Sequence, residues 1–149
     1  MEIRVATEGD LEAVVRLHEA DALGGHGDAW TPETCPAYEA AFAAIAGSPD
    51  TDLYVAVEEG VVVGTFQLQM LHKLTDRGAR KAVLESVQVR ADRRSRGLGA
   101  RMIAEAERLA RARGATALQL TSNKRRTDAH RFYERHGYAR SHEGFRKAL

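Results

Sequence analysis

The sequence lacks several features that would point to particular classes of protein. It has one cysteine, Cys35, which excludes an internal disulfide bond and makes the cytoplasm the expected compartment. It has only three prolines and is 44% hydrophobic, which favours a globular chain over a disordered one. No apolar run reaches about 18 residues, and the first residues read as a polar strand, so we expect neither a membrane span nor a signal peptide.

An excess of charge of one sign is also missing. The formal net charge is +1, so the sequence predicts no overall attraction to nucleic acid or to a membrane. The basic residues are nevertheless clustered, between Arg90 and Arg101 and again between Lys124 and Arg146. Local anion binding is therefore compatible with a nearly neutral chain. With 149 residues and no internal repeat or low-complexity segment, we expect a single domain over 1–149.

The hydrophobic periodicity predicts helices and strands along the whole chain. The expected strands cover 2–6, 53–57, 61–71, 83–89, 115–121 and 138–147. The expected helices begin near Thr7, Thr31, Leu98 and Thr127, and they end near Gly24, Gly47, Arg113 and Gly137. The strands at 53–57 and 61–71 are expected to form a hairpin around Glu58-Glu59-Gly60. The helix from Leu98 is expected to be followed by Gly114 as a C-terminal cap, and its apolar stripe is Leu98, Met102, Ile103, Ala106, Leu109 and Ala110. The order is β-α-α-β-β-β-α-β-α-β. It predicts a fold of the α/β class with one mixed sheet (α+β) that is flanked by helices.

A short basic loop joins the valine-rich strand at 83–89 to the helix that follows. The residues with a predicted binding role in this loop are Arg94, Ser95, Arg96, Gly97, Leu98, Gly99 and Ala100. The first turn of a helix has free N–H groups and a partial positive charge, so it attracts anions. Because Gly97 and Gly99 have no Cβ, a pyrophosphate could approach the backbone closely. A Walker loop is excluded, and Met102 stands where a dinucleotide-binding motif needs its third glycine.

Two blocks of residues resemble those of a known family. The pattern Arg94-x-x-Gly97-x-Gly99 resembles the acetyl-coenzyme A loop of the GNAT acetyltransferase superfamily. Asn123 and the run AHRFYERHGY at 129–138 resemble its A-x-x-F-Y-x-x-x-G-F/Y segment. The resemblance covers the chain almost end to end, and residues 120–149 are also similar to the aminoalkylphosphonate N-acetyltransferase branch. It implies the GNAT fold, whose sheet is mostly antiparallel with a parallel pair at the cofactor.

The resemblance implies acetyl-coenzyme A as co-substrate, and the phosphonate-acetylating branch leaves open a metal ion bound by His26 and His72. It places the peptide groups of Val87, Gln88 and Val89 beside the acetyl and pantetheine groups, and it places Asn123 on the pantetheine amides. His130 and Arg126 either face the phosphates of the coenzyme or are solvated helix positions.

Two residues are candidates for acid–base chemistry. Glu85 is in phase with Val83 and Val87, which predicts a carboxylate on an apolar face of the strand. Burying a carboxylate there is costly unless it is hydrogen-bonded or in contact with water. An alkyl amine has a pKa of about 10.4, so Glu85 could bind it or deprotonate it through water. The alternative is an acid satisfied by a neighbouring strand. The resemblance makes Tyr133 the general acid at the coenzyme sulfur. The alternative is that Tyr133 is an aromatic residue of the core whose hydroxyl is hydrogen-bonded to a neighbouring group.

The acceptor side is the least defined part of the sequence. In the superfamily, the first two helices and their loop cover it, which makes Trp30 and His72 candidate substrate residues, with Trp30 as a loop anchor the alternative. His26 and His72 lack clear metal-ligand spacing, and we predict no metal site. The predicted reaction is transfer of acetyl from acetyl-coenzyme A to a primary amine of a small molecule, by direct attack in a ternary complex. Alternatives are a non-catalytic acyl-coenzyme A sensor, acetylation of a protein amine and, least favoured, nucleic-acid binding. A homodimer is an expectation from the superfamily.

Overall fold

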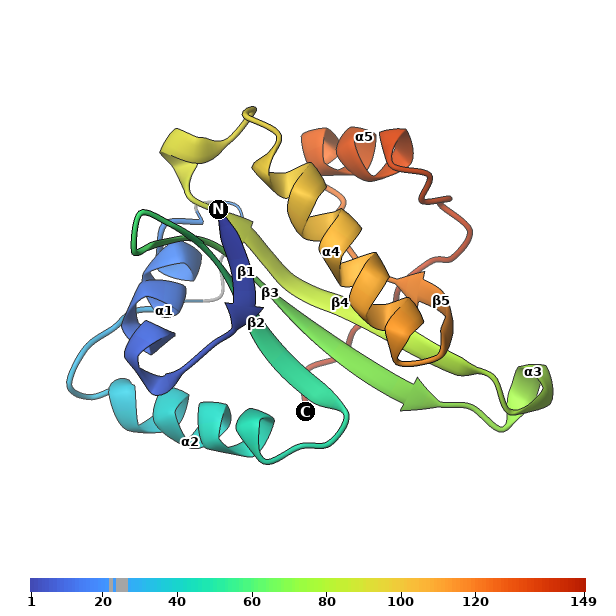
Figure 1. Cartoon of the computed structure of the whole chain (residues 1–149), viewed down its shortest axis with the longest axis horizontal. Helices are drawn as coiled ribbons and strands as arrows, with labels where there is room; N and C mark the ends of the chain where they lie inside the picture. The colour runs from blue at the N-terminus through green and yellow to red at the C-terminus, as the bar shows by residue number, and fades with distance from the viewer. Residues whose placement is uncertain (22, 24–26) are drawn as a thin grey trace.

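The computed structural model describes residues 1–21, 23 and 27–149, and in them it shows a five-stranded sheet with helices on both faces (Figure 1). The strands are β1 (Glu2–Val5), β2 (Thr51–Glu58), β3 (Val61–His72), β4 (Arg80–Val89) and β5 (Ala115–Gln119). The helices are α1 (Leu11–Glu19), α2 (Cys35–Ala46), α3 (Thr75–Gly78), α4 (Leu98–Ala112) and α5 (Thr127–Arg135), with 3-10 turns at Glu8–Asp10 and Ala91–Arg93.

The sheet is mixed, which confirms the predicted fold class. Its order is β1-β2-β3-β4-β5, in which the first four strands are antiparallel neighbours and β5 lies parallel to β4. A parallel neighbour requires a crossover, and α4 supplies it. The predicted hairpin joins β2 to β3, and its turn residues Glu59 and Gly60 have φ of 50° and 77°. Left-handed backbone at both central positions is what a type I′ hairpin turn requires.

Two hydrophobic clusters hold the helices on the sheet, one on each face. Alternate residues of β2 belong to different clusters, because successive strand side chains point to opposite faces. The α4-side cluster includes Tyr54, Ala56, Phe66, Leu68, Met70 and Leu84 of the sheet with Leu98, Met102, Ile103, Ala106 and Ala110 of α4. The α1/α2-side cluster includes Ala6, Leu11, Val14, Phe42, Leu53 and Val55. The buried face of α4 is the stripe that the sequence predicts.

The contact between α4 and the sheet is closest at Gly64 of β3. A Cβ added there would lie 2.6 Å from the sulfur of Met102, which is fully buried. A glycine at this position therefore lets the helix approach the strand backbone. Since Gly64 is paired with Val89, this contact holds the first half of α4 beside the end of β4.

The prediction of a strand over 138–147 is wrong. Residues 138–149 form neither helix nor strand, and all of them after Tyr138 are exposed. The backbone hydrogen bonds of this stretch are local, from Tyr138 N to Tyr133 O and from Ser141 N to Ala139 O. Phe145 is the one large hydrophobic residue between 139 and 147, and it is 98% exposed. Without an alternating apolar face, pairing this segment as a strand would bury little apolar surface.

Candidate active site

The parallel strands β4 and β5 separate partway along their length. Their pairing ends at Val83 opposite Gln119, whereas β4 continues to Val89. In the part of the chain that the structure describes, no strand pairs with this edge of β4 beyond Val83. Peptide groups of residues 84–89 that face the splay therefore lack a ladder partner there, and such an edge can bind the amide groups of an extended ligand.

A β-bulge interrupts β4 within this free segment. Gln67 of β3 lies opposite Glu85, and Thr65 lies opposite Gln88, so two residues of β4 face one residue of β3 between these pairs. Ser86 takes a left-handed φ of 54° to accommodate the extra residue. A bulge of this kind reverses the faces to which the following side chains point.

Because of the bulge, Glu85 does not share a face of β4 with Val87 and Val89, although the sequence predicts that it does. Val87 and Val89 pack against the α4-side cluster, whereas Glu85, opposite Gln67, lies on the face that carries α1 and α2. Glu85 is also exposed, so the predicted apolar face around it is wrong. Its position, two residues beyond the last β4–β5 pair at Val83, keeps its carboxylate beside the splay and in contact with water.

The loop before α4 presents a run of unpaired backbone N–H groups. Ser95 and Gly97 have φ of 58° and 79° and bend the chain just before the helix begins. The first turn of α4 is closed by a hydrogen bond from Arg101 N to Gly97 O at 3.1 Å. No described residue accepts a hydrogen bond from the N–H groups of residues 95–100. This arrangement is a cradle for an anion such as a pyrophosphate.

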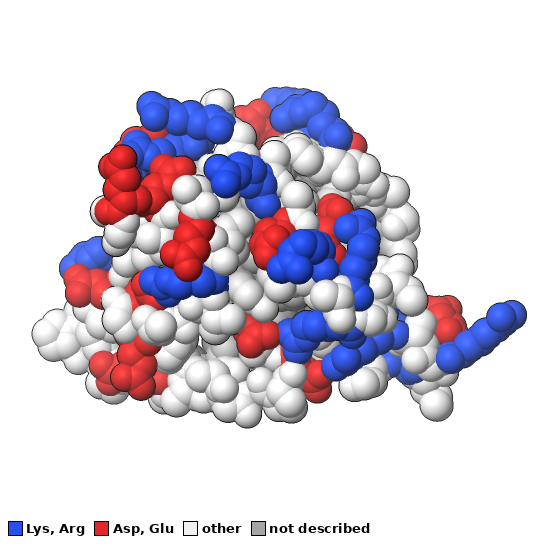
Figure 2. All heavy atoms as spheres, in the orientation of Figure 1, with Lys and Arg blue, Asp and Glu red and all other residues white. Residues whose placement is uncertain are grey.

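The arginines around this loop have different surroundings. Arg93 forms an ion pair with Glu58 at 3.1 Å, so its charge is compensated. Arg94 donates from Nε to the carbonyl of Val89 at 3.0 Å and fixes the loop to the end of β4. The loop arginines that are exposed and have no ion-pair partner among the described residues are Arg94, Arg96 and Arg101. Figure 2 shows basic side chains over the β4–α4 loop and α5, with acidic side chains beside them.

The two glycines of the loop serve different purposes. At Gly97, where φ is +79°, an added Cβ would meet nothing within 4 Å, so the backbone is open to a ligand. At Gly99, an added Cβ would lie 3.3 Å from Cζ of Phe132 on α5. The open space predicted at both glycines is therefore found at Gly97, and at Gly99 it is filled by the packing of α5 on the first turn of α4.

Tyr133 lies half-buried on α5 among aromatic rings. Its ring centroid is 5.3 Å from that of Phe132 and 5.7 Å from that of Tyr138, both in edge-to-face geometry. Burial raises the pKa of the Tyr133 hydroxyl, and the nearby charge of Arg126 opposes that rise. The Tyr138 hydroxyl donates to Glu107 at 3.3 Å, but no group in the described ranges hydrogen-bonds to the Tyr133 hydroxyl. The Tyr133 hydroxyl is thus free to bond to a ligand.

Asn123 folds the segment between β5 and α5 into a turn. Its side-chain oxygen accepts from Arg125 N at 2.9 Å, and its carbonyl accepts from Arg126 N at 2.9 Å. The same carbonyl lies 2.9 Å from Nε2 of His130. The ring of His130 therefore ties the start of α5 to this turn, and the side-chain nitrogen of Asn123 has no partner within the described chain.

Asp21 carries no recognisable pattern in the sequence, yet the structure places it beside two segments of the site. Its carboxylate accepts a hydrogen bond from Nε2 of Gln88 at 2.6 Å and forms an ion pair with Arg126. The side chains of Asp21 and Arg126 are 10% and 25% exposed. These partners lie 67 and 105 positions from Asp21 along the chain, so no local motif could reveal the contact.

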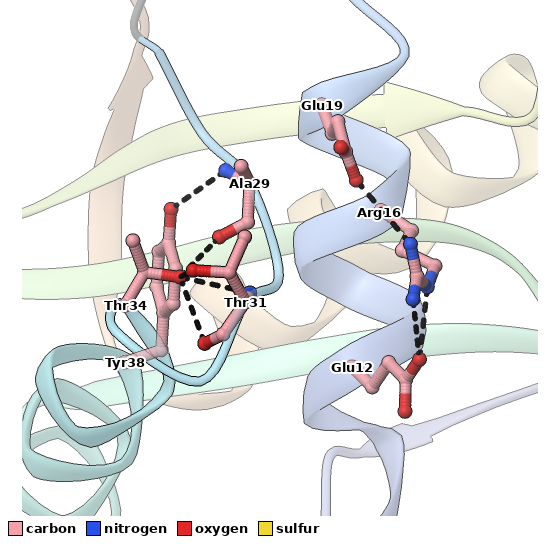
Figure 3. Close-up of polar contacts among 7 residues, drawn as sticks. All are labelled: Glu12, Arg16, Glu19, Ala29, Thr31, Thr34 and Tyr38. Carbon is pink, nitrogen blue, oxygen red and sulfur yellow. Dashed lines mark hydrogen bonds and ion pairs between the residues drawn. The ribbon is translucent and has the colours of Figure 1, made fainter.

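The segment 29–34, just before α2, is held by its own polar contacts, which Figure 3 shows. The hydroxyl of Thr34 donates to the carbonyl of Ala29 at 2.5 Å and accepts from Thr31 N at 3.0 Å. The hydroxyl of Tyr38 accepts from Ala29 N at 3.2 Å. Because this turn is complete before the helix starts, α2 begins at Cys35 instead of Thr31.

The two candidate substrate residues lie apart. Trp30 is half-buried, packs against the α1/α2-side cluster and stacks on Tyr38 with ring centroids 6.1 Å apart, as expected of a loop anchor. His72 is exposed at the end of β3, opposite Arg80. Arg80 and Glu85 are separated by roughly 17 Å along a strand, so the structure does not bring His72 to the splay.

His26, the other histidine of interest, lies outside the described residues. Within the described ranges, no group of three or more His, Cys, Asp and Glu side chains could hold a metal ion. Those ranges also include no helix with the length and apolar character needed to cross a membrane.

Residues 11–138 match the family described as the Acetyltransferase (GNAT) family. An aminoalkylphosphonate N-acetyltransferase from Salmonella typhimurium is 38% identical over 113 residues, which cover 76% of this chain and 73% of that protein.

Solved structures show the same architecture. A protein described as a transcriptional regulator from Bacillus halodurans shares 35% identity, with a TM-score of 0.95 and coverage of 99% of both chains. Glucosamine-6-phosphate N-acetyltransferase from Arabidopsis thaliana shares 18% identity, with a TM-score of 0.79 and coverage of 99% of this chain and 97% of that one. At that identity, the likeness concerns the fold alone.

Proposed function

The chain belongs to the GNAT acetyltransferase family, and on that basis we propose that it moves the acetyl group of acetyl-coenzyme A to the primary amine of a small molecule. The amine attacks the thioester carbonyl directly while both substrates are bound. A C–N bond forms, the C–S bond breaks, and the sulfur leaves as a thiolate that takes up a proton.

One observation carries this proposal: three groups without a partner among the described residues lie where β4 ends, α4 begins and α5 packs on the first turn of α4. They are the free edge of β4, the free N–H groups of residues 95–100 and the hydroxyl of Tyr133. The loop N–H groups suit a pyrophosphate, and the strand edge suits the amides of a pantetheine arm. A phosphate-bearing thioester lying along β4 would then carry its sulfur toward Tyr133.

Each chemical requirement of acyl transfer has a candidate residue. The peptide N–H groups of Val87, Gln88 and Val89 that face the splay would stabilise the oxyanion that forms at the thioester carbonyl. Tyr133 would give its proton to the departing sulfur. Glu85, exposed beside the splay, would receive the proton of the attacking amine through water, because an alkyl amine with a pKa of about 10.4 is mostly protonated near neutral pH.

The acceptor proposed first is a small amine that carries an anionic group. The support for it is the name of the Salmonella relative, which describes aminoalkylphosphonates.

An amine panel with detection of free thiol tests this function. The panel pairs aminoalkylphosphonates with carboxylates and uncharged alkylamines of the same chain length, and adds a polyamine, an aminoglycoside and a lysine peptide. We expect turnover with at least one small amine, and mass spectrometry should find one acetyl group on its nitrogen. Tight binding of acetyl-coenzyme A without turnover of any amine would indicate a sensor, and turnover of the peptide alone would indicate a protein acetyltransferase.

A further inference from the structure

Asp21 and Arg126 form an ion pair that joins two segments on either side of the splay between β4 and β5. Asp21 follows the end of α1, and Arg126 precedes α5. Gln88 of β4 lies between them and donates to the same carboxylate at 2.6 Å. With Asp21 only 10% exposed, this is a nearly buried pair whose geometry is fixed by groups from three elements.

The backbone of Arg126 is also held in place. Its N–H donates to the carbonyl of Asn123 at 2.9 Å, and its own carbonyl accepts from His130 N at 3.0 Å. Tyr133 follows seven positions later, about two turns and about 10 Å along the helix, on the same side. Side chains on a helix lean toward its N-terminus, which directs the Tyr133 ring back toward Arg126. The charge of Arg126 lowers the pKa of Tyr133, against the rise that burial causes.

We propose that Arg126 is a positioning residue for acetyl transfer: held by Asp21, its guanidinium stabilises the negative charge that Tyr133 acquires when it gives its proton to the sulfur. As the C–S bond breaks, its electron pair goes to sulfur, and the proton moves from Tyr133 Oη to that sulfur. The amine loses its first proton to Glu85 before it attacks, and the phenolate regains the second proton, which the nitrogen loses after attack and which passes through water. This inference rests on the acid role proposed for Tyr133.

The physical reason lies in the surroundings of the tyrosine. The Phe132 and Tyr138 rings that contact Tyr133 solvate an anion poorly, so burial alone would disfavour the phenolate. A fixed cation offsets that cost. Asp21 has two effects of opposite kind, because it holds the guanidinium in place and also cancels part of its charge at the tyrosine.

Two variants that remove the same ion pair should therefore shift the Tyr133 titration in opposite directions. Arg126→Gln removes the cation and should raise the pKa of Tyr133. Asp21→Asn keeps an amide oxygen that can accept the hydrogen bond from Arg126 and so still holds the guanidinium. It removes only the compensating charge, and it should therefore lower the pKa of Tyr133. Fluorinated tyrosine, which titrates at lower pH, allows the shift to be followed by fluorine NMR in the folded protein, with Tyr133→Phe to assign the signal. A merely structural ion pair would give shifts of the same direction or none, and either result would overturn the inference.

Kinetics provide the second readout. Arg126→Gln should lower kcat about tenfold with little change in the KM for acetyl-coenzyme A, and Arg126→Lys should restore most of the loss. Arg125→Gln, an exposed neighbour in the same turn, is the matched control and should behave as the parent protein. Full activity of Tyr133→Phe would reject the proposed acid itself. A Tyr133 signal unmoved by Arg126→Gln, with Tyr133→Phe impaired, would reject only the role of Arg126.

Discussion

At the scale of single residues, Tyr133 and Tyr138 differ in what their hydroxyls contact. Tyr138 donates to Glu107, and Tyr133 has no such partner among the described residues. We expect Tyr133→Phe to lower kcat about tenfold to a hundredfold, less than the strongest general acids achieve, because a thiol with a pKa near 8.5 leaves readily. Tyr138→Phe should leave kcat unchanged and cost about 1 kcal/mol of unfolding free energy. Steady-state kinetics would contradict this if both variants lost activity equally.

Gly97 has a matched control in Gly114, at the other end of α4. Their φ values are 79° and 82°, and an added Cβ would meet nothing within 4 Å at either position. Alanine should therefore cost about 1 kcal/mol of unfolding free energy at both sites, through the left-handed backbone alone. Only Gly97→Ala should also raise the KM for acetyl-coenzyme A severalfold, because it adds a methyl group to the proposed pyrophosphate cradle. An unchanged KM in Gly97→Ala would reject that cradle.

At the scale of elements, the turn that starts α1 depends on Asp10. Its carboxylate accepts from Thr7 N at 2.8 Å and from the two terminal nitrogens of Arg4 at 2.7 and 2.9 Å. The hydrogen bond from Arg4 is the main reason that the pKa of Asp10 falls from 3.8 to about 2 in the folded protein. A carboxyl with a lowered folded pKa stabilises the protein above its unfolded pKa and loses that effect as the pH falls toward its folded pKa.

This linkage predicts a pH-dependent contribution of about 2 kcal/mol from Asp10. It should be complete at pH 5 and above and should disappear as the pH falls from about 4 to about 2. Asp10→Asn should lower the unfolding free energy at neutral pH, and its difference from the parent should shrink in acid. Urea unfolding across this range measures both. Glu12→Gln is the control, since Glu12 forms an exposed pair with Arg16, and an equal effect of the two changes would contradict the prediction.

Elements with local signals could be predicted from the sequence, and elements defined by irregular backbone could not. The stripe of α4, the β2–β3 hairpin and the glycine after α4 follow from periodicity and turn chemistry within a few residues. The bulge at Ser86 has no such signal, because a serine rarely takes positive φ and neither glycine nor asparagine marks the site. One extra residue in β4 after Glu85 was enough to put Val87 and Val89 on the face opposite to Glu85, although alternation predicts all three on one face.

At the scale of the whole molecule, contacts between distant segments could not be predicted. The two family-like blocks locate the loop before α4 and the start of α5, but they do not show that Asp21 crosses the splay to meet Arg126. The exposed segment after Tyr138 was also wrongly predicted, since its expected strand would need a partner that its composition does not favour. The homodimer and the cytoplasmic location stay predictions.

The end of the sheet away from the splay is closed by two arginines. Arg113, at the end of α4, donates to Asp52 at 2.5 Å and to the carbonyl of Pro49 at 2.8 Å. Arg80, at the start of β4, donates to Asp50 at 2.7 Å and to the carbonyl of Arg113 at 3.0 Å. These bonds join the start of β2, the start of β4 and the end of α4, near the paired part of β4 and β5.

Arg113 should therefore support the fold without serving the site. Arg113→Ala removes charge-assisted hydrogen bonds and should lower the unfolding free energy by about 2 kcal/mol. Arg111→Ala, two residues earlier in the chain, breaks an exposed pair with Glu107 and should cost less than about 0.5 kcal/mol. Because β4 and β5 separate at the opposite end, the KM for acetyl-coenzyme A should stay unchanged in both variants. A raised KM in Arg113→Ala at full stability would mean that closing this end controls how far the splay opens, and the two ends would then have to be treated as one coupled unit.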